Sequence, residues 1–294
     1  MQKKICDVMY EINFGYNFKR KPMPKLVYSG ELFNEFDSNK FFFIDKTRMI
    51  KTIIEQGNAT YLITRPRRFG KSLNLRMIQE FFEKPCKEEE RRKYLFDGIE
   101  VSKDRKCMRE FHRYHVIYLN FKADEFMKSE SAIRFLKSRV SDLFRYQRIK
   151  IDFKKLDEAT KGKWNIIEKE KEDEHTLVES IRFICDYFKN KNIYERKFII
   201  SIDEYDKILI NSYRYKYYEK ILGIIESFFP NLFKGNTNLY FGIIIGRLNF
   251  GLKSFFSRVN NVHECTFLSD NYFSDCYGFT ENELNKILSH FIYY

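Results

Sequence analysis

The chain has 294 residues, with 53 Lys and Arg against 41 Asp and Glu, so its formal net charge is +12. This length allows one large domain or a domain with a small appendage, and the 31 Phe and 20 Tyr residues exclude a disordered polymer. The basic bias is compatible with phosphate-bearing partners, although a Lys-rich composition often only solvates a surface.

Cysteine usage and hydropathy indicate where the protein acts. Six cysteines occur without a C-x-x-C pair or a metal-like Cys/His spacing, which predicts a reduced, intracellular protein, cytoplasmic or nuclear. The N-terminus lacks the long apolar core of a signal peptide. The strongest apolar run, YFGIIIG at 240–246, has the length of a strand and not the ~20 residues of a membrane span. We therefore expect no membrane partner.

The first 30 residues carry six basic and two acidic groups, and we interpret residues 1–30 as a basic N-terminal arm. A helical period follows in DKTRMIKTIIEQG at 45–57, where the apolar residues fall on one face and Gly57 ends the pattern. Asp45 occupies the position expected of the helix N-cap. A central domain is predicted over residues 31–250.

Strands and helices alternate in this central domain. The apolar run ATYLIT at 59–64 has strand length, and a helical spacing begins at Ser72 and ends before Pro85. A second strand is expected at HVIYLNF, residues 115–121, and an amphipathic helix follows it. Two strands joined through a helix suggest a right-handed crossover and hence a parallel sheet.

Residues 146–175 interrupt the alternation. From Arg148 through Glu174 they hold eight basic and eight acidic residues, which favours a solvated, charged insertion. Order returns at a capping box formed by Thr176 and Glu179, which predicts the start of a helix.

Two strongly apolar strands and two helices complete the chain. The strands are expected at KFIISID (197–203) and LYFGIIIG (239–246). A long helix between them is predicted to end at Pro230. A second T-x-x-E capping box lies at 280–283, so residues 251–294 are interpreted as the start of a helical C-terminal region.

The segment TRPRRFGKS at 64–72 joins the first strand to its helix. Phosphate loops have the pattern G-x-x-x-x-G-K-[ST], in which backbone N–H groups before a helix cradle the phosphate oxygens. Gly70 allows the backbone to approach closely, Lys71 would reach the β- and γ-phosphates of a nucleotide, and the Ser72 hydroxyl would ligate Mg²⁺. The candidate nucleotide-binding residues are Arg67, Arg68, Phe69, Gly70, Lys71 and Ser72.

The first glycine of that pattern is absent, because Arg65 occupies its position. Pro66 fixes its own φ and restricts Arg65, so rigidity could maintain the turn that glycine usually permits. The arginines at 65, 67 and 68 are expected to add positive charge where the phosphates would lie. A Gly-Lys-Ser tripeptide alone carries little information, and its strand-loop-helix context decides its meaning.

A pair of carboxylates follows the strand at 197–203. Open parallel sheets bind ligands at the carboxyl ends of their strands, where Asp203 would hold Mg²⁺ together with Ser72. Glu204 would act as a catalytic residue that orients and deprotonates an attacking water. The alternative is a polar turn that only caps the following helix.

The two motifs in chain order predict an α/β fold, a P-loop NTPase three-layer sandwich with a mainly parallel sheet and a short helical C-terminal extension. The strand expected at 115–121 lies between the motifs in sequence. This order is compatible with an arrangement in which a strand separates the two motifs in the sheet.

Seven stretches of the chain together resemble the AAA-ATPase-like family of P-loop proteins, over roughly residues 33–288. They are FFFIDKTRMIKTII, YLITRPRRFGKSLNLRMIQEFF, LFDGIEV, HVIYLNFK, IDEYDK and FGIIIGRLNFGLKSFFSRVNNV with CYGFTENEL. Since RPRRFGKS is very specific to that family, the resemblance makes the absent glycine a family trait. It implies ATP binding through Lys71 and Ser72, with Asp203 and Glu204 as the acidic motif. Asp45 also matches the family, although an N-cap accounts for it.

Members of this family often carry an arginine shortly after the glycine that ends the last core strand. Aligned on Gly246, that arginine would fall on Asn249, and the nearest cation here is Arg247. Arg247 is a third catalytic candidate beside Glu204 and Lys71, since it could sense the γ-phosphate, or it is only a solvated arginine. Many members are longer and continue into a domain similar to PD-(D/E)XK nucleases. We expect no such nuclease-like domain here, and we interpret the chain as a short paralogue or as a fragment of a longer protein.

The preferred hypothesis from the sequence is a Mg²⁺-dependent ATPase whose biological role the residues do not identify. The alternative is a nucleotide-switched binding module, in which hydrolysis is slow or lost and positive charge engages nucleic acid. A P-loop kinase is a weaker third option, because no acceptor site is identifiable. A protein partner, the oligomeric state and an arginine from a neighbouring subunit stay open.

Overall fold

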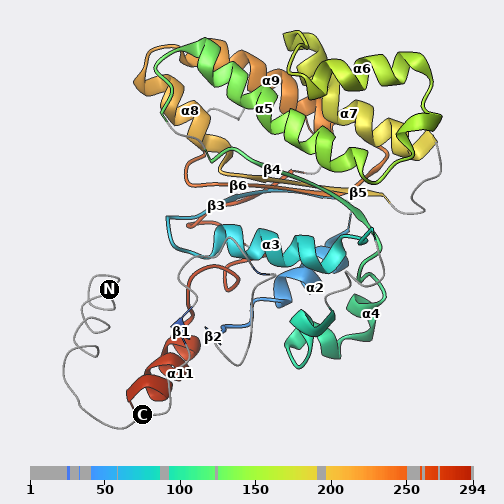
Figure 1. Cartoon of the computed structure of the whole chain (residues 1–294). Coiled ribbons are helices and arrows are strands. Elements are labelled where there is room, and N and C mark those ends of the chain that lie inside the picture. The colour runs from blue at the N-terminus through green and yellow to red at the C-terminus, as the bar shows by residue number, and fades with distance from the viewer. Residues whose placement is uncertain are drawn as a thin grey trace. The chain divides into compact units, whose positions relative to one another are not determined.

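The computed structural model describes residues 25–26, 33, 41–57, 59–86, 93–122, 125–190, 197–249, 259, 262–270 and 272–292 (Figure 1). The chain divides into two compact units. The smaller unit takes its described elements from β1 (Lys25–Leu26), β2 (Phe41–Phe42) and α11 (Glu281–Ile292), and β1 pairs with β2 in parallel. Apart from β1, the basic arm predicted over residues 1–30 lies outside the described residues.

The larger unit is built on a five-stranded sheet. Its strands lie in the order β4 (His115–Asn120), β5 (Phe198–Asp203), β6 (Leu239–Gly246), β3 (Thr60–Thr64) and β7 (Val262–Cys265). Every neighbouring pair in this sheet is parallel, so all five carboxyl ends point to one edge. The predicted α/β fold with a parallel sheet is therefore confirmed.

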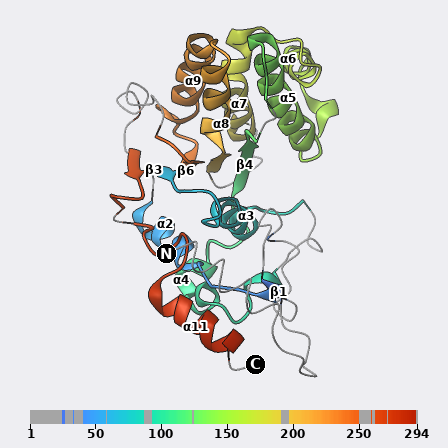
Figure 2. The same cartoon turned by 90° about the vertical axis from the view of Figure 1, so that its left-hand side faces the viewer.

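Helices cover both faces of this sheet and complete three layers (Figures 1 and 2). One face carries α5 (Ser129–Arg148), α6 (Glu158–Glu168), α7 (Glu174–Asn190), α8 (Tyr205–Arg214) and α9 (Tyr218–Phe233). The other face carries α2 (Arg48–Gln56), α3 (Lys71–Phe82) and α4 (Arg105–Met108). Short 3₁₀ turns lie at η3 (Lys93–Phe96), η4 (Glu100–Lys103) and η5 (Phe153–Lys155).

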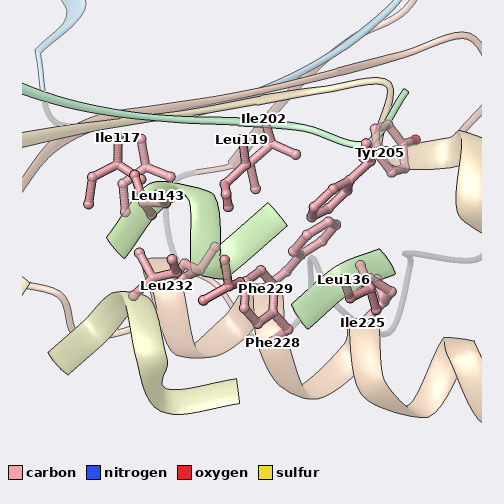
Figure 3. Packing of buried hydrophobic residues seen from close by; sticks show 14 of the residues in the cluster. Ile117, Leu119, Leu136, Leu143, Ile202, Tyr205, Ile225, Phe228, Phe229 and Leu232 are labelled. Atoms are coloured by element: carbon pink, nitrogen blue, oxygen red, sulfur yellow. The ribbon is translucent and has the colours of Figure 1, made fainter. Parts of the chain in front are cut away.

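A large apolar core lies between the sheet and the five-helix layer (Figure 3). Ile117 and Leu119 of β4 and Ile202 of β5 face Leu136 of α5 and Phe229 of α9 there. Every residue of β5 is buried, because helices cover both of its faces. This double burial explains why the central strands have continuous apolar sequences rather than alternating ones.

The first helix of the larger unit differs slightly from its prediction. α2 ends as expected, because Gly57 takes a left-handed φ of 67°. The N-cap is Thr47 and not Asp45. One Asp45 oxygen accepts hydrogen bonds from the Thr47 N–H (2.8 Å) and hydroxyl (2.6 Å), and the other accepts from the Glu100 N–H (2.7 Å). Asp45 thus ties α2 to η4 instead of capping its own helix.

The charged segment at 146–175 is not the solvated insertion that its composition predicts. It contains α6, whose Trp164 and Ile167 are fully buried in the main core. A count of charges along the sequence does not reveal this helix, because its few apolar residues lie on one face and charged residues occupy the rest. The predicted capping box of Thr176 with Glu179 is also wrong: α7 begins at Glu174, and the cap is Asp173, which accepts from the Thr176 N–H at 2.7 Å.

The helix predicted to end at Pro230 is two helices. α8 and α9 are separated near Lys216, whose φ is +63°, and Pro230 lies inside α9. A proline removes one backbone donor, but the apolar packing of α9 keeps the last turn helical. In the smaller unit, by contrast, the second capping box is confirmed. The Thr280 N–H donates to Glu283 at 2.8 Å, and the Glu283 N–H donates to the Thr280 hydroxyl at 3.3 Å.

Among the described residues, no helix combines the length and the apolar character that crossing a bilayer requires. The described cysteines, Cys86, Cys107, Cys185, Cys265 and Cys276, all carry free thiols.

Candidate functional site

The carboxyl edge of the sheet gathers the residues singled out from the sequence. The loop 65–70 follows β3, Asp203 and Glu204 end β5, and Arg247 follows β6. β6 lies between β3 and β5, so Arg247 leaves the sheet between the two motifs. A strand therefore does separate the motifs, but it is β6. The strand at 115–121, which the sequence suggested for this place, lies on the far side of β5.

The loop reaches α3 through two left-handed residues. Arg68 has a φ of 65° and Gly70 a φ of 77°, while Arg65 keeps a negative φ. The first helical hydrogen bond runs from the Asn74 N–H to the Gly70 carbonyl at 2.9 Å, so α3 starts directly after the loop. The position of the missing glycine thus has a conformation that any residue adopts.

Lys71 closes the loop on itself. Its ammonium donates to the Pro66 carbonyl at 2.7 Å. Burial lowers the pKa of Lys71, with Arg247 adding to this effect, whereas Asp203 and Glu204 act in the opposite direction. The ammonium therefore lies in the combined field of the loop, the acidic pair and the cation after β6. A phosphate oxygen could take the place of the Pro66 carbonyl as its acceptor.

Asp203 is the polar centre of the edge and is fully buried. Its carboxylate accepts hydrogen bonds from the Glu204 N–H at 2.9 Å and from the Tyr118 hydroxyl at 3.3 Å, and the Ser72 hydroxyl lies close enough to lower its pKa. Burial raises the pKa of Asp203 above its ordinary value, although these donors oppose the shift. The structure thus places the two predicted metal ligands, Ser72 and Asp203, next to each other.

The chemistry of these donors suits Mg²⁺. The ion prefers oxygen ligands and is usually held by one or two protein groups together with water and phosphate oxygens. Ser72 and Asp203 supply a hydroxyl and a carboxylate side by side. The buried carboxylate would also gain from a nearby cation, because burial penalises its charged form.

Glu204 lies at a strained point of the backbone. It is half-buried and has a φ of 51°, a left-handed conformation that is unfavourable for a residue with a side chain. The bond from its N–H to the Asp203 carboxylate holds this conformation. Strained backbone of this kind often occurs at functional sites, where the surrounding structure fixes it.

The backbone that leads into Arg247 is held by α8. The Asp206 carboxylate accepts from the Arg247 N–H at 3.0 Å and from the Leu248 N–H at 3.1 Å. Gly246 permits this contact, since a Cβ there would lie 2.8 Å from Oδ1 of Asp206. Asn249, where family members are expected to carry their arginine, donates to Glu264 at 2.9 Å instead. Arg247 is therefore the cation that the end of β6 presents next to Lys71.

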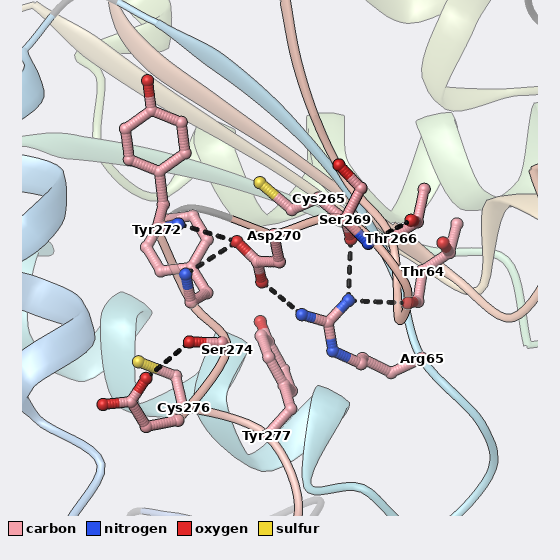
Figure 4. Close-up of polar contacts among 12 residues, drawn as sticks. Thr64, Arg65, Cys265, Thr266, Ser269, Asp270, Tyr272, Ser274, Cys276 and Tyr277 are labelled. Atoms are coloured by element: carbon pink, nitrogen blue, oxygen red, sulfur yellow. Dashed lines mark hydrogen bonds and ion pairs between the residues drawn. The ribbon is translucent and has the colours of Figure 1, made fainter.

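Arg65 corrects one expectation from the sequence. Its side chain is buried, and the guanidinium donates to the carbonyls of Thr64 at 2.8 Å and Cys265 at 2.7 Å (Figure 4). It also forms an ion pair with Asp270 and lies over the ring of Tyr277, 5.2 Å from the centroid. The prediction that Arg65 adds charge where phosphates would lie is therefore wrong, because Asp270 neutralises it.

Comparison with known families decides what kind of protein this is. A family model described as "Predicted AAA-ATPase" matches residues 28–256, well over half of the chain. The chain belongs to the AAA-ATPase-like family. The resemblance seen in its motifs is thus confirmed, and family membership supports nucleotide binding.

The chain is also similar to part of a longer protein. An uncharacterized protein in the vnfD 5′ region of Azotobacter chroococcum mcd 1 is 24% identical over 256 residues. This alignment covers 86% of the present chain and 42% of that relative, so the chain spans less than half of its length. No solved structure matches the chain.

Three residues of this AAA-ATPase-like site were missed from the sequence. Tyr118 donates to Asp203, Asp206 holds the backbone of Arg247, and Asp270 binds Arg65. The first two had a visible signal, since Tyr118 lies near the end of a predicted strand and Asp206 belongs to the IDEYD motif. Asp270 had no signal in the sequence, because 205 residues separate it from Arg65.

Proposed function

We propose that the chain binds Mg²⁺ and ATP at the carboxyl edge of its sheet and hydrolyses the nucleotide. One observation carries the proposal: the Ser72 hydroxyl lies beside the buried Asp203 carboxylate and lowers its pKa, next to Lys71 at the start of α3. This arrangement brings the phosphate loop and the acidic strand together, which is the pairing that a metal-bound polyphosphate requires. Membership of a family of predicted AAA-ATPases supports the same assignment.

Each residue of the site has a proposed role. The backbone N–H groups of Arg67, Arg68, Phe69, Gly70, Lys71 and Ser72 would face the phosphate oxygens, and the N-terminus of α3 favours their charge. The Lys71 ammonium would leave the Pro66 carbonyl and donate to the β- and γ-phosphates. The exposed side chains of Arg67 and Arg68 would add positive charge at the entrance.

Ser72 and Asp203 would hold Mg²⁺, which neutralises phosphate charge when it is bound. Glu204 would orient a water molecule and accept its proton, since its half-buried carboxylate lies close enough to influence Lys71. Arg247 would stabilise negative charge that develops on the transferring phosphoryl group. The cysteines among the described residues are free and mostly buried, which supports a reducing, intracellular location.

The variant Glu204→Gln separates binding from hydrolysis. We expect it to keep the Mg·ATP affinity within about twofold and to lower the turnover rate roughly 10²- to 10⁴-fold, since only proton transfer is lost. Titration calorimetry measures the first quantity and phosphate release the second. A suitable control is Glu219→Gln in the exposed first turn of α9, which should change neither.

Three outcomes decide between the hypotheses. Wild-type protein that shows no Mg·ATP binding by calorimetry overturns the proposal. Tight binding with no turnover would support the nucleotide-switched binding module instead, in which the net charge of +12 engages a nucleic acid or another anionic partner. Turnover that survives Glu204→Gln would remove this residue from the catalytic role.

A further inference from the structure

The chain from the end of β7 onward contacts the phosphate loop at two points and the start of α3 at a third. We name residues 265–270 and 272–278 the brace. The Cys265 carbonyl and the Asp270 carboxylate bind the Arg65 guanidinium at the start of the loop. In the middle of the loop, the Phe69 carbonyl accepts from the Gly278 N–H at 3.2 Å. Beyond the loop, the side chain of Asn74 donates to the Cys276 carbonyl at 2.7 Å. The brace thus follows the loop from its first residue into the first turn of α3.

Side-chain packing adds to these polar contacts. The Phe69 ring lies edge-on to the ring of Phe267, with 6.0 Å between the centroids. The same ring packs on Gly278, where an added Cβ would lie 3.1 Å from two of its carbons. A left-handed φ of 72° at Gly278 turns the brace at this contact. The loop therefore has little freedom to move away from the brace.

Asp270 is the centre of the brace (Figure 4). One carboxylate oxygen accepts from the N–H groups of Tyr272 and Phe273, both at 2.8 Å, and the other pairs with Arg65. Both side chains of the ion pair are 3% exposed. Because backbone donors fix the carboxylate and the pair is shielded from water, Asp270 holds the guanidinium in one place.

Arg65 passes this restraint to the loop through its own backbone. Its N–H donates to the Gly246 carbonyl at 3.1 Å, so the end of β6 holds its main chain. Its guanidinium reaches the end of β7 on the other side of β3. The residue in the position of the first glycine is therefore anchored to both neighbouring strands, and Pro66 limits the next φ.

We propose that Asp270 is a positioning residue of the nucleotide site. Through Arg65 it fixes the start of the loop, so that the N–H groups from Arg67 to Ser72 stay arranged for phosphate before a ligand arrives. Binding by a preorganised loop loses less conformational freedom, and small displacements of such donors weaken binding strongly. This inference rests on the proposed binding of Mg·ATP, and its test is designed to fail separately from that proposal.

The test compares two Asp→Asn variants of the brace in the full chain. Asp270→Asn removes the charge of the buried pair. Asp275→Asn is the matched control, because Asp275 pairs with Arg48 at 2.9 Å with 64% and 47% of the two side chains exposed. We expect Asp270→Asn to raise the Kd for Mg·ATP at least about tenfold and Asp275→Asn to change it less than about twofold, since exposed pairs are screened by solvent.

Titration calorimetry at low temperature measures the Kd and the stoichiometry separately. A merely structural role of Asp270 would not change the Kd of the folded molecules. A positioning role raises Kd while the stoichiometry stays at one ATP per chain and the circular dichroism spectrum stays native. A structural role lowers the stoichiometry and leaves Kd unchanged. Arg65→Lys is a second variant, which keeps the charge but loses the planar fork of donors, and we expect an intermediate rise of Kd.

Each outcome has one meaning. Wild-type chain that does not bind Mg·ATP overturns the proposed function, and this inference falls with it. Wild-type binding together with an unchanged Kd in Asp270→Asn overturns the positioning role alone. So does a lowered stoichiometry at constant Kd. A raised Kd at full stoichiometry in Asp270→Asn, with Asp275→Asn unaffected, supports it.

Discussion

Gly246→Ala tests the close approach between β6 and α8. The added Cβ would lie 2.5 Å from Cε1 of Tyr205 and 2.8 Å from Oδ1 of Asp206. Carbon atoms in contact are normally about 3.5–4.0 Å apart, so the overlap with Tyr205 is about 1 Å. Both neighbours are fully buried. Tyr205 also donates to the Leu248 carbonyl at 2.6 Å, so neither neighbour can move without losing contacts.

The expected destabilisation has two parts. Overpacking of a well-packed core lowers the free energy of unfolding by about 1–3 kcal/mol. Displacing Asp206 would weaken its bonds to the N–H groups of Arg247 and Leu248, each worth about 1.5–3 kcal/mol for a charged acceptor. Since the backbone can relax in part, we expect a total loss of about 2–4 kcal/mol. The turnover rate should fall more than the Mg·ATP affinity, because Arg247 leaves the sheet at this point.

Urea unfolding followed by circular dichroism measures the loss. The matched control is Gly223→Ala, because Gly223 is exposed within α9 and an added Cβ there meets nothing within 4 Å. We expect this control to raise the free energy of unfolding by about 0.5–1 kcal/mol, since alanine restricts the unfolded chain and favours helix. A Gly246→Ala variant as stable as the wild type, with an unchanged urea slope, would refute the close approach.

Three further predictions concern other parts of the larger unit. Asp203→Asn should raise the melting temperature at neutral pH while it reduces Mg²⁺-dependent turnover, because burial raises the pKa of this carboxyl and its charge opposes folding; a lower melting temperature in scanning calorimetry would contradict this. Arg68→Gly should increase the free energy of unfolding by about 0.5–1 kcal/mol by relieving the left-handed backbone, and any weaker ATP binding would measure the contribution of its charge. Trp164→Ala should lower the free energy of unfolding by about 3–5 kcal/mol in chemical denaturation, whereas a loss under 1 kcal/mol would mean that α6 is not part of the core.

The elements that the sequence predicts well are those whose pattern has a single physical cause. β5 and β6 appear as continuous apolar runs because both of their faces are covered, and no other arrangement buries such runs so simply. α2 and its end at Gly57 follow from a helical period closed by a left-handed glycine. The capping box at 280–283 depends only on residues three positions apart, so it too can be recognised locally.

The errors occur where tertiary packing outweighs a local signal. Trp164 buries α6 within a segment whose charges suggest a solvated loop. Pro230 stays inside α9, since the apolar residues around it keep the helix packed. Thr176 and Glu179 have the spacing of a capping box, but Asp173 starts α7 earlier. In each case the sequence contains a valid local preference, and contacts with distant residues decide against it.

The candidate site divides in the same way. Ser72, Asp203 and Arg247 could be predicted together, because a parallel sheet places the ends of its strands at one edge. The identity of the strand between the two motifs could not be predicted, since the order of strands in a sheet depends on packing and not on chain order. The ion pair between Arg65 and Asp270 could not be predicted from local sequence, because neither residue is unusual among its neighbours in sequence.

The ion pair between Arg65 and Asp270 explains why the loop does not need the first glycine of the usual pattern. Glycine at the start of a phosphate loop serves where the backbone needs a left-handed turn, and here the left-handed residues are Arg68 and Gly70. Arg65 keeps a negative φ and uses its side chain to bind the end of β7. Restoring glycine at position 65 would therefore leave Asp270 buried without its cation, which is more unfavourable than never burying the charge. Arg65 and Asp270 form one buried ion pair, so we expect a change at position 65 to disturb the loop less when Asp270 is replaced as well.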